Sequence, residues 1–176
     1  MNSATTLTGA AAEPPRTHRL LGIYVLLIII AVIETFDGLS GAPILFGDMS
    51  EIPGPGVGGA IVKAYIASHP VLALAALALA ATGHVRYAIM ALGALVLMNW
   101  LNDMPSMVRH GLDFRGVSAF ETPVRIIAFP LMAACGIALA AHGQRPGLAT
   151  LLVSIPTLYG VFAVIAFGIG IILHGF

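Results

Sequence analysis

Charged side chains are scarce in this sequence. Only 9% of its 176 residues are Asp, Glu, Lys or Arg, whereas a soluble domain carries about a quarter. Hydrophobic residues make up 59% and the mean hydropathy is +0.97. The eight basic residues are scattered singly and the net charge is zero, so no basic patch is present to bind a phosphate backbone. The composition therefore predicts membrane lipids, and not nucleic acid, as the partners of this chain.

Motifs for catalysis and metal binding are also missing. Cys135 is the one cysteine and has no second thiol to pair with. No serine lies in a Gly-x-Ser-x-Gly context, and no glycine-rich loop carries the lysine and hydroxyl that bind phosphate. The six histidines include no His-x-x-x-His or Glu-x-x-His pair, and only His69 lies deep in an apolar stretch, so neither a metal site nor a haem is predicted. We therefore favour a non-enzymatic role without a bound cofactor.

Five apolar stretches approach the length of a membrane-spanning helix, which needs about 20 apolar residues. They cover residues 20–38, 57–81, 86–102, 117–141 and 147–173. The sequence thus predicts an all-α polytopic membrane bundle, a single transmembrane domain over residues 20–176. The small, polar, proline-containing residues 1–19 are expected to form a mobile cytoplasmic tail. A cleaved signal peptide is disfavoured for the first stretch, because its apolar run is already of spanning length and two acids follow it.

The second and fourth stretches resemble each other. Residues 57–83 align with residues 117–143 without gaps, and Pro70 falls on Pro130. Each copy is followed by a basic turn and another apolar stretch, so the pattern predicts a repeated helix hairpin with both copies in one orientation. Alanine-rich helices also match by chance, and the sequence leaves both explanations open. Each proline removes a helix hydrogen bond, and we expect neighbouring groups to satisfy the freed carbonyl.

Basic residues near the ends of the stretches predict the orientation in the membrane, because they mark the cytoplasmic side. The four that share one side are Arg16, Arg19, Arg86 and Arg145. Residues 102–117, on the other side, contain two further arginines, which weakens the asymmetry. We expect a cytoplasmic amino terminus and an exterior carboxyl terminus, in a bacterial inner membrane.

Polar side chains gather near the exterior end of four predicted helices. Glu34 is the deepest acid, about 21 Å past Leu20 along a helix in a hydrocarbon core about 30 Å thick. Asp37 lies on the same face one turn further, whereas Trp100 is expected to face the lipid interface. The candidate cluster comprises Glu34, Asp37, Lys63, His69, Asn99, Asn102, Asp103, Glu121 and Arg125.

This cluster is compatible with two functions. An unpaired charge in hydrocarbon costs at least about 2.5 kcal/mol, so we expect Glu34 and Asp37 to pair with Lys63 or Arg125. As a clamp that fixes helix register, the cluster suits a non-catalytic accessory or structural subunit of a larger membrane protein complex. As a cavity for an ion, a proton path, a lipid or a quinone head group, it suits a small carrier or a quinone-linked redox component. The alanine-faced helices favour the accessory subunit, with the carrier or redox component as the alternative.

Overall fold

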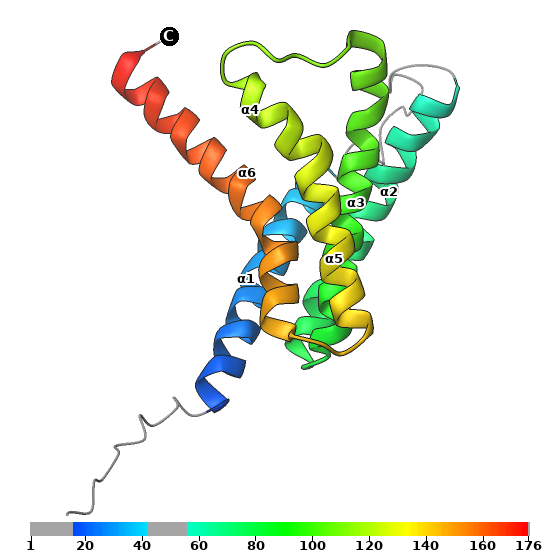
Figure 1. Cartoon of the computed structure of the whole chain (residues 1–176), viewed down its shortest axis with the longest axis vertical. Coiled ribbons are helices and arrows are strands. Elements are labelled where there is room, and N and C mark those ends of the chain that lie inside the picture. Colours follow the sequence, from blue (N-terminus) through cyan, green and yellow to red (C-terminus); the bar gives the residue numbers. More distant parts are fainter. Residues whose placement is uncertain (1–15, 42–55, 176) are drawn as a thin grey trace, which may run out of the picture.

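The structure, a computed structural model, describes residues 16–41 and 56–175, which form helices and no strand (Figure 1). The elements are α1 (Arg16–Gly41), α2 (Val57–Ala81), α3 (Val85–His110), α4 (Ser118–Pro123), the π-helical segment η3 (Val124–Ala128), α5 (Phe129–Ala141) and α6 (Pro146–His174). Since α4, η3 and α5 are continuous, five helices are long and apolar enough to cross a membrane. The predicted all-α membrane bundle is confirmed. The expected tail lies outside the described residues as far as residue 15, and α1 already begins at Arg16.

The third helix is longer than its apolar stretch. The sequence predicts its end at residue 102, but α3 continues to His110. There Gly111 adopts a φ of 76° and donates its N–H to the Met107 carbonyl at 2.9 Å. Hydropathy marks where lipid ends, whereas a helix ends where its backbone hydrogen bonding ends. The polar residues of the candidate cluster on α3 are therefore all helical.

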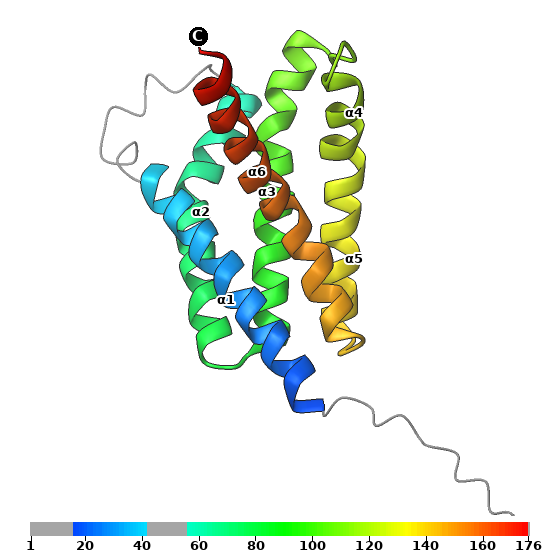
Figure 2. The same ribbon diagram turned by 90° about the vertical axis from the view of Figure 1, so that its left-hand side faces the viewer.

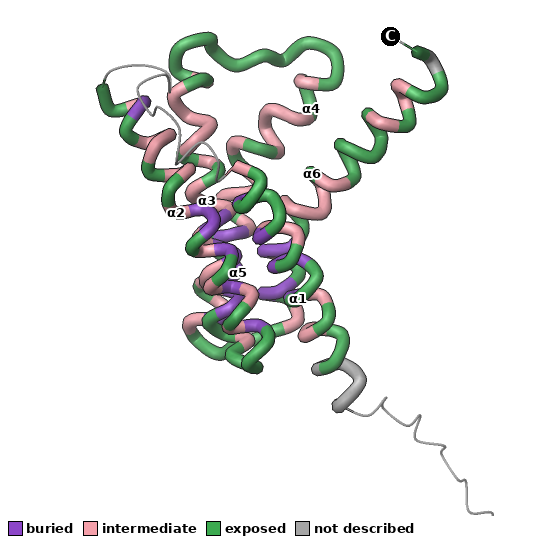
Figure 3. Tube along the Cα trace, turned by 180° about the vertical axis from the view of Figure 1, so that it is seen from behind, coloured by how far each residue is buried: buried purple, intermediate pink, exposed green. Residues whose placement is uncertain are grey.

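The bundle is narrow at one end and open at the other. Turns 82–84 and 142–145 lie at its narrow end, which we call the turn end, and α6 leans away from α4 toward the opposite, wide end (Figure 1). Most buried residues gather in the half nearer the turn end (Figure 3). Helices approach closely there, because a Cβ on Gly93 would lie 2.6 Å from Ile137 Cγ1 and one on Gly136 would lie 2.7 Å from Val153 Cγ1. Small residues therefore close the turn end.

The two helix hairpins, α2–α3 and α4–α6, end their first helices with the same backbone motif. In each, a glycine in the left-handed region and the residue after it donate N–H groups back to the last helical turn, as in a Schellman cap. These hydrogen bonds run from Gly83 to Ala80 (3.1 Å), His84 to Leu79 (2.8 Å), Gly143 to Ala140 (3.0 Å) and Gln144 to Leu139 (2.9 Å). Both hairpins therefore turn at equivalent residues.

Buried positions repeat between the hairpins as well. In the first helices the equivalent buried residues are 60 positions apart, and in the second helices they are 61 apart. The pairs are Ala73 and Ala133, Ala76 and Gly136, Ala80 and Ala140, then Ala88 and Ala149, Ile89 and Thr150, Leu92 and Val153, Gly93 and Ser154. The second turn is longer by one residue, and it contains Arg145 with a φ of 41°. The structure thus agrees with the predicted hairpin repeat and adds a one-residue offset in its second helix.

Candidate functional site

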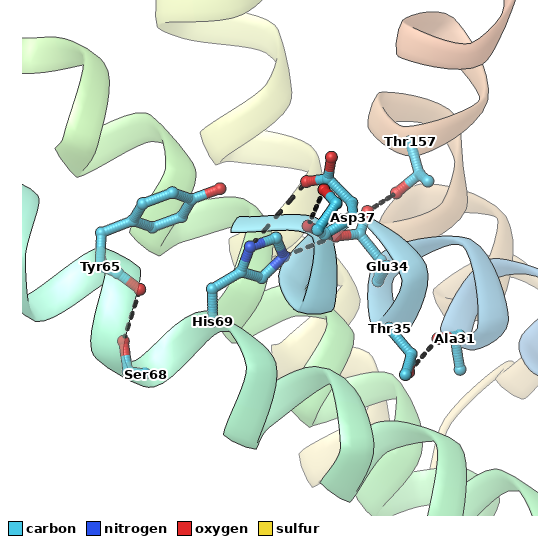
Figure 4. Close-up of polar contacts among 9 residues, drawn as sticks. Ala31, Glu34, Thr35, Asp37, Tyr65, Ser68, His69 and Thr157 are labelled. Carbon is cyan, nitrogen blue, oxygen red and sulfur yellow. Dashed lines mark hydrogen bonds and ion pairs between the residues drawn. The ribbon is translucent and has the colours of Figure 1, made fainter. Parts of the chain in front are cut away.

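Glu34 connects three helices through its carboxylate. Its Oε1 accepts a hydrogen bond of 2.6 Å from the Thr157 hydroxyl on α6, and its Oε2 lies 3.1 Å from His69 Nε2 on α2 (Figure 4). The side chains of Glu34 and His69 are only 18% and 8% exposed. The expected pairing of Glu34 with Lys63 or Arg125 is therefore wrong. Lys63 lies six residues before His69, about 9 Å along α2 toward the wide end, so the imidazole is the group at the depth of Glu34.

His69 lies between two acids and beneath an aromatic ring. Its Nδ1 is 3.9 Å from Asp37 Oδ2, which is too long for a direct hydrogen bond. The Tyr65 ring stacks on the imidazole, with centroids 5.1 Å apart and an interplanar angle of 22°. Helical spacing produces both contacts, because Asp37 follows Glu34 by three residues and Tyr65 precedes His69 by four. Both imidazole nitrogens therefore face a carboxylate (Figure 4).

A glycine brings these two helices together. A Cβ on Gly38 would lie 3.0 Å from the Pro70 Cα and 3.2 Å from the Pro70 nitrogen, so α1 contacts the backbone of α2 directly. This contact lies one residue after Asp37 and one residue after His69. The absence of a side chain at Gly38 therefore sets the separation across which the acids of α1 meet the imidazole.

Arg125 forms a second polar group with two acids. Its guanidinium lies 2.8 Å from Asp103 Oδ2 on α3 and 3.6 Å from Glu121 Oε1 one turn earlier on α4. The pairing of Glu121 with Arg125 is the one that their spacing of four residues favours. Asp103 adds a connection to α3, so the group fixes the fourth span against the third.

Trp100 is half-buried and points toward the fourth span instead of outward, so its predicted orientation is wrong. The indole Nε1 donates a hydrogen bond of 3.0 Å to the Ile126 carbonyl in η3. In an α-helix this carbonyl would accept a hydrogen bond from the residue four positions later, which here is Pro130 and has no N–H. Satisfying a carbonyl freed by proline is thus what turns the indole inward, as expected for such carbonyls in lipid.

A cavity of about 520 Å³ lies among these groups at the wide end. Every span contributes to its wall, and the aliphatic part comes mainly from α6. The residues of the predicted cluster that line it are Glu34, Asp37, His69, Asn99, Asp103, Glu121 and Arg125. Lys63 and Asn102 are not among the lining residues. The structure therefore brings most of the predicted cluster around one space.

The cavity lies between the two hairpins, because equivalent positions of both line it. On the first helices these positions are Tyr65 with Arg125 and His69 with Phe129. On the second helices they are Leu95 with Pro156, Val96 with Thr157, Asn99 with Gly160, Trp100 with Val161 and Asp103 with Val164. Sequence reasoning missed the whole contribution of α6, including Thr157. Extending the repeat into the fifth stretch with the one-residue offset would have found it.

Comparison with protein-family models, with curated proteins and with solved structures gives no match for this chain. Among the described residues, no group of three or more His, Cys, Asp or Glu side chains is placed to hold a metal ion. The chain is a small integral membrane protein, because its described residues form five helices long and apolar enough to cross a membrane. Its most distinctive feature is a polar and aromatic cavity between two parallel helix hairpins.

Proposed function

We propose that this chain is a small membrane carrier that binds an amphipathic small molecule in the cavity at the wide end. The observation that supports this most is the lining of one cavity by equivalent positions of two parallel hairpins. In many transporters built from repeats, the substrate site lies at the interface between the repeats. A volume of about 520 Å³ also falls within the range of about 300–1,000 Å³ that small-molecule sites occupy.

A purely structural clamp explains the cavity less well. Hydrogen bonds between membrane helices contribute about 0.6 kcal/mol on average, whereas a charged side chain at the centre of a spanning helix, the region that Glu34 approaches most closely, costs at least about 2.5 kcal/mol. The wall carries four carboxylates, those of Glu34, Asp37, Asp103 and Glu121. Fixing helix register needs neither so many acids nor an open space between them. Binding of a ligand in this space would explain both the number of acids and the space between them.

The cavity wall also provides a route from the membrane. Val164 and Ile165 of α6 line the cavity and are 72% and 50% exposed, so the part of the wall that they form borders the lipid. An apolar tail would lie along these residues while the polar head meets Glu34 and His69. We infer that the ligand enters laterally, between α6 and α4, where these helices diverge (Figure 1).

The accessory-subunit prediction remains the second candidate, and the exposed small residues of α6 favour it. Gly160, Ala163 and Ala166 are exposed, and a Cβ on Gly160 would meet nothing within 4 Å. Small residues of this kind let another membrane helix approach closely. Cross-linking in membranes before mild-detergent purification would reveal a stoichiometric partner, which the carrier does not require.

Two glycines of α6 provide a matched test of the carrier. Gly160 lines the cavity and Gly168 does not, and a Cβ at either position would meet nothing within 4 Å. Gly160→Leu should therefore fill part of the cavity without disturbing the fold, whereas Gly168→Leu makes the same change on the same helix away from the cavity. Mass spectrometry of small molecules extracted from each purified variant should show a molecule that Gly160→Leu loses and Gly168→Leu retains. Identical extracts from all three proteins, with no molecule in stoichiometric amount, would contradict the carrier.

A further inference from the structure

We propose that the ligand of this cavity is a lipophilic organic cation, such as a protonated amine or a quaternary ammonium or phosphonium ion with apolar substituents. This inference rests on the proposed carrier function and specifies its substrate class. It follows from the charge of the wall, the aromatic rings on it and the excess of hydrogen-bond acceptors over donors among the lining side chains.

The formal charge of the cavity wall is negative. Four carboxylates face one guanidinium and one imidazole, so the wall stays negative whether or not His69 carries a proton. The guanidinium of Arg125 lies within 4 Å of two of those carboxylates, Asp103 and Glu121, and its charge is therefore compensated within the protein. An anion entering the cavity would meet repulsion. A cation would supply the missing counter-charge, which matters most in a low-dielectric site.

Aromatic rings line the same space. Tyr65, Trp100, Phe129 and Tyr159 all contribute to the wall. All four are held by neighbours: Tyr65 stacks on the imidazole, Phe129 contacts Tyr159 edge-on with centroids 5.5 Å apart, and the Trp100 indole donates to the Ile126 carbonyl. The face of an aromatic ring attracts a cation within about 6 Å of its centroid, and groups of such rings bind quaternary ammonium ions. Rings and carboxylates together match a cation with apolar substituents.

A quinone head group fits the wall less well than a cation. Its carbonyl oxygens accept hydrogen bonds, so it needs donors. The indole of Trp100 already donates to the Ile126 carbonyl, and Arg125 already donates to Asp103. His69 Nε2 lies 3.1 Å from a Glu34 oxygen. Tyr65, Tyr159 and Asn99 add hydroxyl and amide donors to the wall, but each of these groups can also accept, and the four ionised carboxylates can only accept. Acceptors therefore outnumber donors on the wall, which suits an ammonium head.

Trp100 provides the readout for a test. It is the only tryptophan of the chain and it lines the cavity, so its fluorescence reports ligand entry. We would titrate the protein in lipid nanodiscs with tetraphenylphosphonium, with its anionic isostere tetraphenylborate and with neutral triphenylphosphine oxide. Empty nanodiscs correct for partitioning into lipid.

Tetraphenylphosphonium should change Trp100 emission saturably, and the anion should not. Glu34→Gln should weaken cation binding about tenfold or more, because the attraction of one negative charge of the wall is lost, whereas Asp113→Asn in the exposed loop removes an acid without effect.

Comparing the three probes distinguishes a wrong substrate class from a wrong carrier proposal. Binding of neutral triphenylphosphine oxide or of anionic tetraphenylborate as tight as that of the cation overturns the cation assignment and leaves a carrier of another substrate class. Absence of saturable binding for all three probes overturns the cation assignment as well. The carrier proposal is then tested independently by mass spectrometry, which shows whether Gly160→Leu loses a bound molecule that Gly168→Leu retains. The comparison of isosteres uses the unmodified protein, so it decides the question even where Glu34→Gln does not fold.

Discussion

Gly38→Ala tests whether the contact between α1 and α2 positions the Glu34–His69 pair. The added Cβ would lie 3.0 Å from the Pro70 Cα, whereas ordinary carbon contacts are about 3.5–4.0 Å. Because the opposing atoms belong to a backbone, α1 has to move by about 0.5–1 Å. A displacement of that size would stretch the 3.1 Å contact between Glu34 and His69 beyond the usual hydrogen-bond range of about 3.2 Å.

The change that Gly38→Ala makes in the free energy of unfolding has two opposing parts. Overpacking a close helix contact costs about 1–3 kcal/mol, while alanine stabilises a helix over glycine by about 0.8–1 kcal/mol. Gly22→Ala on the same helix isolates the second part, since a Cβ on Gly22 meets nothing within 4 Å. The free energy of unfolding of Gly38→Ala should therefore fall about 1–3 kcal/mol below that of Gly22→Ala.

Reversible unfolding in mixed micelles would measure this difference, with Trp100 fluorescence as the probe. Ligand affinity should fall in Gly38→Ala and stay unchanged in Gly22→Ala, since only the first substitution disturbs the polar group. Equal stabilisation by both substitutions would show that Gly38 does not hold α1 against Pro70. A destabilised Gly38→Ala with unchanged affinity would separate the helix contact from the site and refute its positioning role.

Two further predictions rest on the Glu34 and Trp100 contacts, and a third rests on the distribution of basic residues. A double-mutant cycle of Glu34→Gln and His69→Gln should give a coupling free energy of about 0.6–2 kcal/mol in unfolding experiments, and additive effects would mean that the pair contributes nothing. Trp100→Phe keeps an aromatic ring but leaves the η3 carbonyl without its donor, so thermal unfolding should show a loss of about 1–3 kcal/mol; unchanged stability would indicate that water replaces the indole. In a cysteine-free background, an impermeant maleimide added outside intact cells should label Gly111→Cys and spare Gly83→Cys, and the reverse pattern would invert the predicted topology.

The sequence predicted the helices better than the contacts between them. Residues 57–81 were predicted as a span and α2 has those bounds, because its apolar run, its glycine-rich start and its Gly83 cap all coincide. Hydropathy alone placed the end of α3 at residue 102, since it does not report backbone hydrogen bonding beyond the lipid. Periodicity also placed Glu34 and Asp37 on one face correctly.

The choice of partners could not be read from the sequence. Formal charge favoured Lys63 or Arg125 as the partner of Glu34, but the depth of each residue depends on where two helices touch. That point is the contact of Gly38 with Pro70, which no periodicity reports. Thr157 was missed for a related reason, because nothing distinguishes it from the other hydroxyl side chains of α6 until the one-residue offset aligns it with Val96.

Placing both hairpins in one chain lets the two sides of the cavity differ. If two identical hairpins surrounded a central space, each lining position would occur twice and a ligand could bind in two equivalent ways. Here the counterpart of His69 is Phe129, and the counterpart of Asp103 is Val164, so one hairpin carries an imidazole and an acid where the other carries a phenyl ring and an aliphatic side chain. α1 has no counterpart in the repeat and contributes Glu34 from one side alone. An elongated ligand would consequently have one preferred orientation in the cavity, with its head and tail distinguished by the protein.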